Sequence, residues 1–147
     1  MARLGREDWL ALGRAAIEEE GPSGLTVEAL TRRAGKTRGS FYHHFESQGA
    51  FLRALAAAWA AEGGEGLATE RGLRAIPEAA EALAAADAAR LARFRATLPA
   101  PGPEGEAYAE IAQALRLGAL LMPATTEARL AELQALLAAM VEAHWHE

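Results

Sequence analysis

The residues best suited to chemistry lie between Thr26 and Phe45. Residues 29–45 carry four Lys or Arg side chains, two histidines and no acidic residue. Arg38 can make a bidentate contact to guanine, the commonest specific contact between a side chain and a base. Neighbouring polar groups can donate hydrogen bonds to phosphates or bases; they belong to Lys36, Thr37, Ser40, Tyr42, His43 and His44. The segment therefore predicts a surface that binds nucleic acid.

Two short helices must position these side chains. Thr26 is suited to cap the first helix, and Glu28 is favourable in its positive first turn. Gly35 follows after about two turns, and glycine is the usual residue for ending a helix and turning sharply. Thr37 is expected to cap the second helix, which should continue to about His44, and Ser47 is expected to cap the helix after it.

This second helix has the properties of a recognition helix. It is basic, and its N-terminal residues, which would meet base edges in the major groove, are polar. Phe41 and Phe45 lie four residues apart, so we expect both to face inward and fix the helix to its neighbours. Together the two helices and the Gly35 turn predict a helix-turn-helix.

The composition predicts an all-α protein. The 147 residues include 38 Ala and 20 Leu, whereas Val, Ile and Thr together number only 12. Ala and Leu favour helices, and strands are enriched in β-branched residues. Beyond the helix-turn-helix, apolar periodicity and turn residues predict helices over about 6–20, 48–61, 67–75, 77–98, 106–122 and from 126 almost to the C-terminus, with a loop over 99–105.

Several functional classes are not expected. Without cysteine, the chain has no disulfide, thiolate zinc site or Cys nucleophile. No apolar stretch is long enough to span a membrane, and the charged N-terminus is unlike a signal peptide, so we expect a cytoplasmic protein. No catalytic grouping or cofactor motif is present, so we expect no enzyme. His144 and His146, near Glu142, are two residues apart and do not share a helix face, which argues against a metal site.

Charge is divided unevenly along the chain. The formal net charge of −5 would argue against a nucleic-acid partner if it were spread evenly. Residues 1–60, however, hold 8 Lys and Arg against 7 Asp and Glu, whereas residues 61–147 hold 7 against 13. The net charge therefore averages a basic recognition segment with an acidic C-terminal part.

The same segment resembles a known family. The run GLTVEAL at residues 24–30, followed by AGKTRGSFYHHF at residues 34–45, is similar to the signature of the TetR family of transcriptional regulators. The resemblance covers about residues 6–60. It implies a three-helix DNA-binding domain, a connecting helix, and a helical C-terminal domain that binds ligand and dimerises. It also implies a repressor that a small molecule releases from a palindromic operator.

The resemblance assigns roles to individual residues. Thr26 would contact phosphate from the start of its helix. The residues facing the groove would be Lys36, Thr37, Arg38, Gly39 and Ser40, and those contacting backbone or flanking bases would be Tyr42, His43 and His44. Gln48 stands where the family commonly has a phosphate-binding lysine, so we expect weaker affinity and weaker salt dependence there. The C-terminal domain is also expected to be shorter than is usual in the family.

The last two expected helices, about 106–122 and 126–146, carry more apolar surface than one small bundle can bury. An apolar surplus of this kind indicates a partner surface, and a two-fold dimer would match a palindromic operator. We therefore expect a helix-turn-helix domain over 1–46 and a regulatory and dimerisation domain over 47–147, with residues 47–62 as the connecting helix.

The sequence thus predicts a homodimeric repressor that binds double-stranded DNA and is released by a small apolar effector. Two alternatives stay open. In the first, the C-terminal part only dimerises and the regulator needs no ligand. In the second, the chain is a helical protein–protein adaptor whose basic hairpin is incidental.

Overall fold

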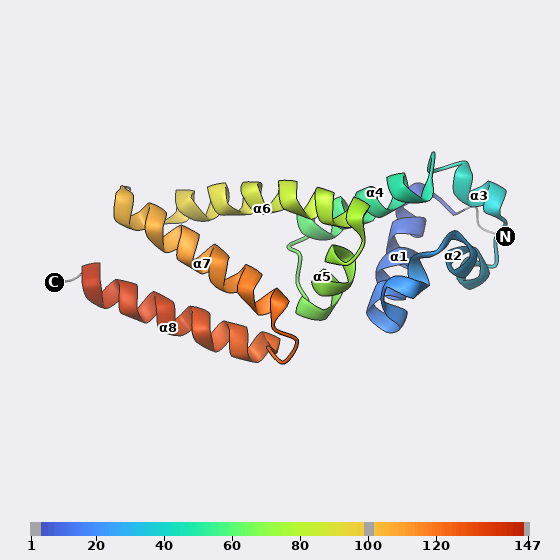
Figure 1. The fold of residues 1–147 in the computed structure, drawn as a ribbon. Coiled ribbons are helices and arrows are strands. Elements are labelled where there is room, and N and C mark those ends of the chain that lie inside the picture. Colours follow the sequence, from blue (N-terminus) through green and yellow to red (C-terminus); the bar gives the residue numbers. More distant parts are fainter. Residues whose placement is uncertain (1–3, 99–101, 146–147) are drawn as a thin grey trace. The chain divides into compact units, whose positions relative to one another are not determined.

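The computed structural model describes residues 4–98 and 102–145, and its regular structure there is entirely helical, which confirms the all-α prediction (Figure 1). The elements in chain order are α1 (Arg6–Glu20), the 3₁₀ helix η1 (Gly21–Leu25), α2 (Val27–Ala34), α3 (Arg38–Tyr42), α4 (Gln48–Ala61), α5 (Leu67–Arg74), α6 (Pro77–Thr97), α7 (Pro103–Leu121) and α8 (Glu127–Trp145). None of these helices is both long and apolar enough to cross a bilayer.

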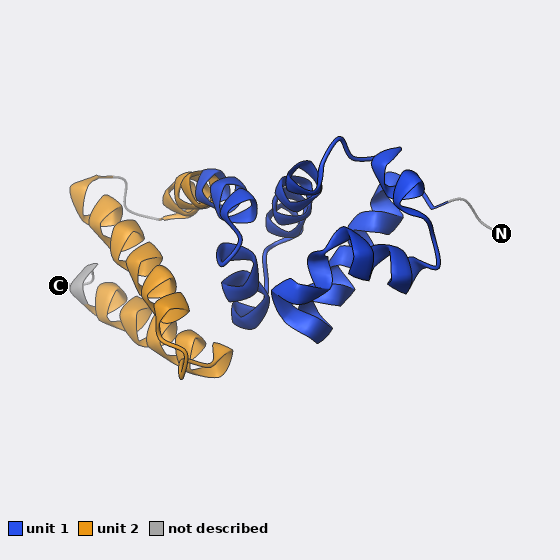
Figure 2. Ribbon diagram, turned by 45° about the vertical axis from the view of Figure 1, so that its right-hand side comes forward, with its two compact units in different colours: residues 1–86 blue, residues 87–147 orange. Residues whose placement is uncertain are grey.

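The chain divides into two compact units, residues 1–86 and residues 87–147 (Figure 2). Unit 1 contains the helices from α1 to α5 and the beginning of α6. Unit 2 contains the rest of α6 together with α7 and α8. The functional boundary expected at residue 46 stays a prediction.

The expected caps are present at three helix starts. The side-chain oxygens of Thr26, Thr37 and Ser47 each accept a hydrogen bond from the backbone N–H three residues later, at 3.1, 3.3 and 3.0 Å. Each cap satisfies one of the N–H groups that a helix start leaves without a backbone partner. Gly35 ends α2 with φ = +61°, the left-handed conformation that glycine adopts without strain.

Two boundaries differ from the prediction. The α-helix α3 ends at Tyr42 rather than His44, because the chain turns there and the His44 N–H bonds to the Phe41 carbonyl at 3.0 Å. Helix α7 begins at Pro103, inside the expected loop, because proline is compatible with the first helical position. Residues 99–101 of that expected loop lie outside the described residues.

The core of unit 1 joins α1, α2, α3 and α4. Its fully buried side chains include Trp9, Leu30, Phe51 and Leu55. Helix α1 approaches α4 closely at Gly13, where a Cβ atom would lie 2.6 Å from Cζ of Phe51. A glycine is therefore required at this crossing.

Unit 2 buries less of its apolar surface. The rings of Phe94 and Tyr108 join α6 to α7 with centroids 5.6 Å apart, and Arg95 pairs with Glu110 at 3.0 Å. Leu120 and Leu130 are buried. Large apolar side chains nevertheless remain exposed on or next to α7 and α8, namely Ile111, Leu121, Met122, Leu136 and Met140.

Replacement of Gly13 by Ala should destabilise unit 1. The added methyl group would overlap the buried Phe51 ring, and overpacking of this kind costs about 1–3 kcal/mol. The free energy of unfolding, measured by chemical denaturation, should fall accordingly. Gly39→Ala in α3 is the control, because its Cβ would meet nothing nearer than Thr37 Oγ1 at 3.8 Å. Equal stability of the two variants would contradict a close crossing of α1 and α4 at Gly13.

Candidate nucleic-acid interface

Helix α3 is held in place by an aromatic cluster beneath it. The side chain of Phe41 is fully buried, and its ring centroid lies 5.3–5.4 Å from those of Trp9, Tyr42, Phe45 and Phe51. An isolated helix of five residues is not stable in water, so this packing must supply most of its stability. The prediction that Phe41 and Phe45 face inward is confirmed.

Arg6 fixes the other end of α3, which sequence reasoning did not anticipate. Its Nη1 donates to the carbonyl of His44 at 2.9 Å, and its guanidinium carbon lies 4.5 Å from the centre of the Phe45 ring. The hydrogen bond satisfies a carbonyl just beyond the helix end, and the ring contact is a cation–π interaction. The start of α1 therefore anchors the turn that leads out of α3.

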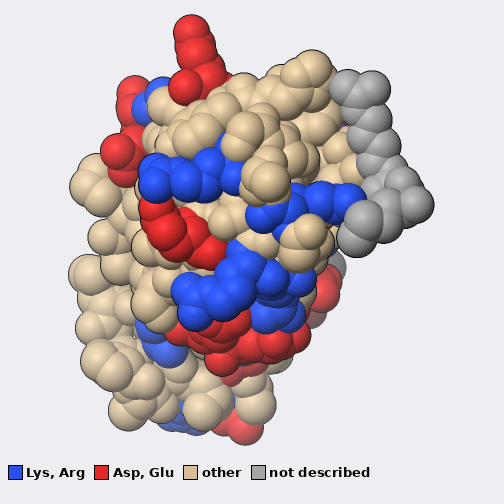
Figure 3. All heavy atoms as spheres, turned by 90° about the vertical axis from the view of Figure 1, so that its right-hand side faces the viewer, with Lys and Arg blue, Asp and Glu red and all other residues tan. Residues whose placement is uncertain are grey.

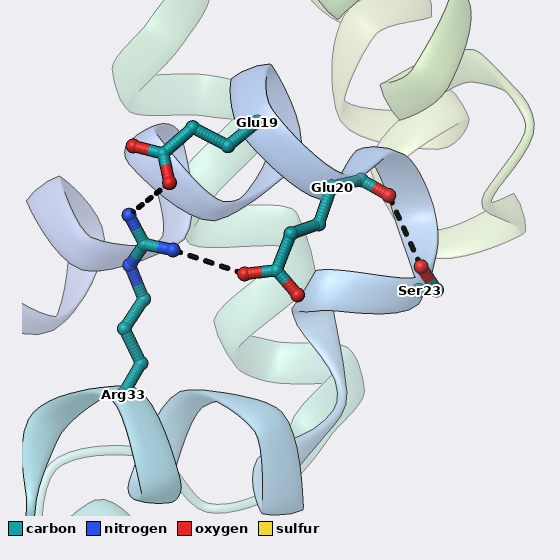
Figure 4. Close-up of polar contacts among 4 residues, drawn as sticks. All are labelled: Glu19, Glu20, Ser23 and Arg33. Carbon is teal, nitrogen blue, oxygen red and sulfur yellow. Dashed lines mark hydrogen bonds and ion pairs between the residues drawn. The ribbon is translucent and has the colours of Figure 1, made fainter.

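Arg33 anchors α2 to the end of α1. Its two terminal nitrogens bind different carboxylates, Glu19 at 2.7 Å and Glu20 at 2.9 Å (Figure 4). The hydrogen bond to Glu19 is the main reason that the pKa of Arg33 is raised above its ordinary value. Arg33 is one of the four cations counted in residues 29–45. Because its charge is paired with two carboxylates of α1, its role in the structure is to join α2 to α1.

Each of the predicted DNA-binding residues is at least partly accessible in unit 1. Those that are exposed are Thr26, Thr37, Arg38, Gly39, Tyr42 and His43, and those that are half-buried are Lys36, Ser40, His44 and Gln48. Figure 3 faces the end of unit 1 that carries α2 and α3, and shows Lys and Arg side chains across it with acidic groups beside them. The helix-turn-helix thus presents polar donors rather than apolar surface.

The first turn of α3 can approach another molecule closely. Thr37 caps the helix. Gly39 has no side chain, and no other part of the protein fills the space beside it, so its backbone is accessible. Arg38, the first residue of the helix, extends from the same turn with a side chain that is 64% exposed. Its Nη1 lies 3.1 Å from Oε1 of Glu28 in the first turn of α2.

Gln48 is positioned differently from the other candidates. Its Nε2 donates to the carbonyl of Leu25 at 3.3 Å, so the amide links the start of α4 to the end of η1. The phosphate contact expected of Gln48 stays a prediction. Its amide N–H already has a partner within the protein, which sequence spacing alone did not indicate.

The structure offers no metal site among the residues it describes, since no three His, Asp or Glu side chains come together there. The side chain of His144 and all of His146 lie outside the described residues, so the expectation drawn from their spacing stays a prediction.

Comparisons with known proteins agree with this geometry. A family model described as bacterial regulatory proteins, tetR family, matches residues 10–55, which span most of α1 through the middle of α4. The crystal structure of the reduced form of E. coli NemR has a similar fold, with a TM-score of 0.70 and 23% sequence identity over 90% of this chain and 94% of that chain. No curated protein matches the chain.

Gly39→Ala should separate folding from DNA binding. Alanine is favoured over glycine within a helix by up to about 1 kcal/mol, and the site has room for the methyl group, so the melting temperature should hold or rise. The methyl group would face the DNA, so affinity for duplex should fall about tenfold or more in a mobility-shift titration. Full binding by this variant would mean that DNA does not approach the backbone at residue 39.

Proposed function

We propose that this chain is a DNA-binding transcriptional regulator of the tetR family and that it represses transcription as a homodimer bound to a palindromic operator. The match of residues 10–55 to the family model supports this assignment. The observation that carries the proposal is the accessible polar first turn of α3, in which Thr37, Arg38 and Gly39 are exposed, supported by the buried aromatic cluster. A polar turn on a rigid base is what a recognition helix requires.

Each subunit would insert residues 37–44 into a major groove. Arg38 would bind a guanine edge, while Thr26 would bind a phosphate and Tyr42 would bind backbone or flanking bases. The two copies of α3 would have to lie about 34–36 Å apart, or a multiple of that distance, to enter successive grooves on one side of the duplex. The protein would act in the cytoplasm, where the chromosomal DNA of a bacterium lies.

The proposed dimer surface is formed by α7 and α8. Leu136 and Met140 are four residues apart on α8, with exposed fractions of 59% and 64%, and Leu121 ends α7 with 84%. Large apolar side chains on neighbouring helices favour a partner with the same surface. Two helices from each subunit would then form a four-helix bundle.

Release by a small apolar ligand belongs to the proposal, and one cavity bears on it. Unit 2 has a cavity of about 140 Å³, whose lining combines apolar Leu91 and Phe94 with polar Arg90, Gln113, Arg116 and Gln134. Ligand sites usually exceed about 300 Å³, so an effector here would have to be very small or would have to widen the cavity. This size favours the second candidate function, a dimeric regulator that needs no ligand.

Selection of genomic fragments by the purified protein tests DNA binding directly. Fragments recovered at low salt should share a palindromic site, and their affinity should fall steeply as salt increases, because phosphate contacts release counterions. Failure to retain any fragment at low salt would refute the proposal. A stable complex with another protein in place of DNA would instead support the adaptor alternative.

Arg38→Ala should remove recognition at one base pair in each half-site. Loss of a bidentate contact to guanine costs about 1–3 kcal/mol. The affinity of the variant can be titrated against a set of operators, each with one base pair replaced. At one position, the variant should bind the original and the replaced base pair equally well. If the base preferences of the variant match those of the wild type, Arg38 does not bind a base.

Leu136→Glu should prevent dimerisation while leaving the subunit folded, because the side chain is exposed in the single chain but would be buried in the dimer. Light scattering should give a monomer, and affinity for the full palindrome should fall toward that for a half-site. Ala131→Glu is the control: it adds the same charge to α8 at an exposed position about 140° around the helix. A dimeric Leu136→Glu variant would place the interface elsewhere.

A further inference from the structure

We propose that Glu28 strengthens the base preference of Arg38 in the recognition helix by orienting its guanidinium. This inference rests on the proposed DNA-binding function and adds a residue to it. Glu28 lies in α2, outside the recognition helix, and is the single acidic residue of the proposed DNA-binding segment, residues 26–45. Its role would be to position Arg38 rather than to contact the operator.

The geometry places the two side chains together at the start of both helices. Glu28 is in the first turn of α2, just after the Thr26 cap, and Arg38 is the first residue of α3, just after the Thr37 cap. Oε1 of Glu28 lies 3.1 Å from Nη1 of Arg38, and the two side chains are 59% and 64% exposed. The ion pair therefore lies on the surface that carries the predicted DNA-binding residues.

The ion pair and a guanine contact are chemically compatible. A guanidinium has five N–H donors in a fixed plane, so one carboxylate contact leaves enough donors for the two acceptors of guanine. A long arginine side chain loses rotamer freedom when it binds a base. If Glu28 already restricts that freedom in the unbound protein, less is lost on the operator, and the angle of approach is fixed.

The negative charge of Glu28 has a second consequence. Phosphates repel a carboxylate on this face, so Glu28 weakens the sequence-independent part of binding. Orientation of Arg38 strengthens the sequence-dependent part at one base pair. Both effects increase the ratio of operator affinity to nonspecific affinity, which is the quantity that decides site selection in a genome.

Glu28→Gln is the direct test, because glutamine keeps the shape of the side chain and removes its charge. Arg38→Ala first identifies the base pair that Arg38 contacts. At that base pair, Glu28→Gln should reduce discrimination between the preferred and substituted operators by roughly two- to fivefold, the range expected from an exposed ion pair. Its affinity for an unrelated duplex should rise over the same salt range.

Glu62→Gln is the matched control. It changes the net charge of the protein by the same amount and removes another ion pair of unit 1, that between Arg14 and Glu62 at the end of α4. Neither residue of that pair is among the predicted DNA-binding residues. Discrimination at the Arg38 base pair should stay at the wild-type value in this variant. Circular dichroism verifies that all variants are folded.

A double-variant measurement identifies the route of the effect. If Glu28 acts through Arg38, Glu28→Gln should not change base preference further when Arg38 is already Ala. A change of preference at a different base pair would show that Glu28 contacts a base itself, for example a cytosine amino group, and would overturn the inference.

If Glu28→Gln binds DNA and discriminates at the Arg38 base pair as well as the wild type does, the inference is overturned as well. A wild-type protein that binds no duplex would overturn the proposed function and this inference together.

Discussion

Burial of the Phe41 ring is the constraint on which the recognition surface depends. Helix α3 has only five residues, too few to persist through its own hydrogen bonds. Contact of Phe41 with Trp9 from α1 and with Phe51 from α4 gives this short helix a fixed position on longer ones. The polar first turn can therefore lie at the surface and keep its shape, because the apolar half of the same helix carries the stability.

Polar contacts of the cations add to the apolar packing that positions α2 and α3. The cations around α2 and α3 differ in what they bind. Arg33 joins α2 to α1 through two carboxylates, Arg6 holds the end of α3, and Arg38 extends from its start. Part of the positive charge of this segment is therefore bound within the protein, and net charge alone describes this surface poorly.

Unit 2 differs from unit 1 in where its large apolar side chains lie. Its helices leave large apolar side chains such as Leu136 and Met140 exposed, while the cavity lined by Phe94 measures only about 140 Å³. In the described part of unit 2, several large apolar side chains thus lie on the outside of the helices. A surface of this kind suits association between subunits more than enclosure of a ligand.

Local sequence was sufficient for the fold class, the caps at Thr26, Thr37 and Ser47, the turn at Gly35 and the inward direction of Phe41, because each depends on residues a few positions apart. The match of residues 10–55 to the tetR family confirmed the resemblance that these residues suggested. Only the tertiary structure decided what each cation binds, since Arg6 donates to the backbone carbonyl of His44, whereas Arg33 pairs with Glu19 and Glu20, and Arg38 pairs with Glu28. Such pairs form across helix interfaces, where partners are set by the angle and distance between helices and not by spacing along the chain.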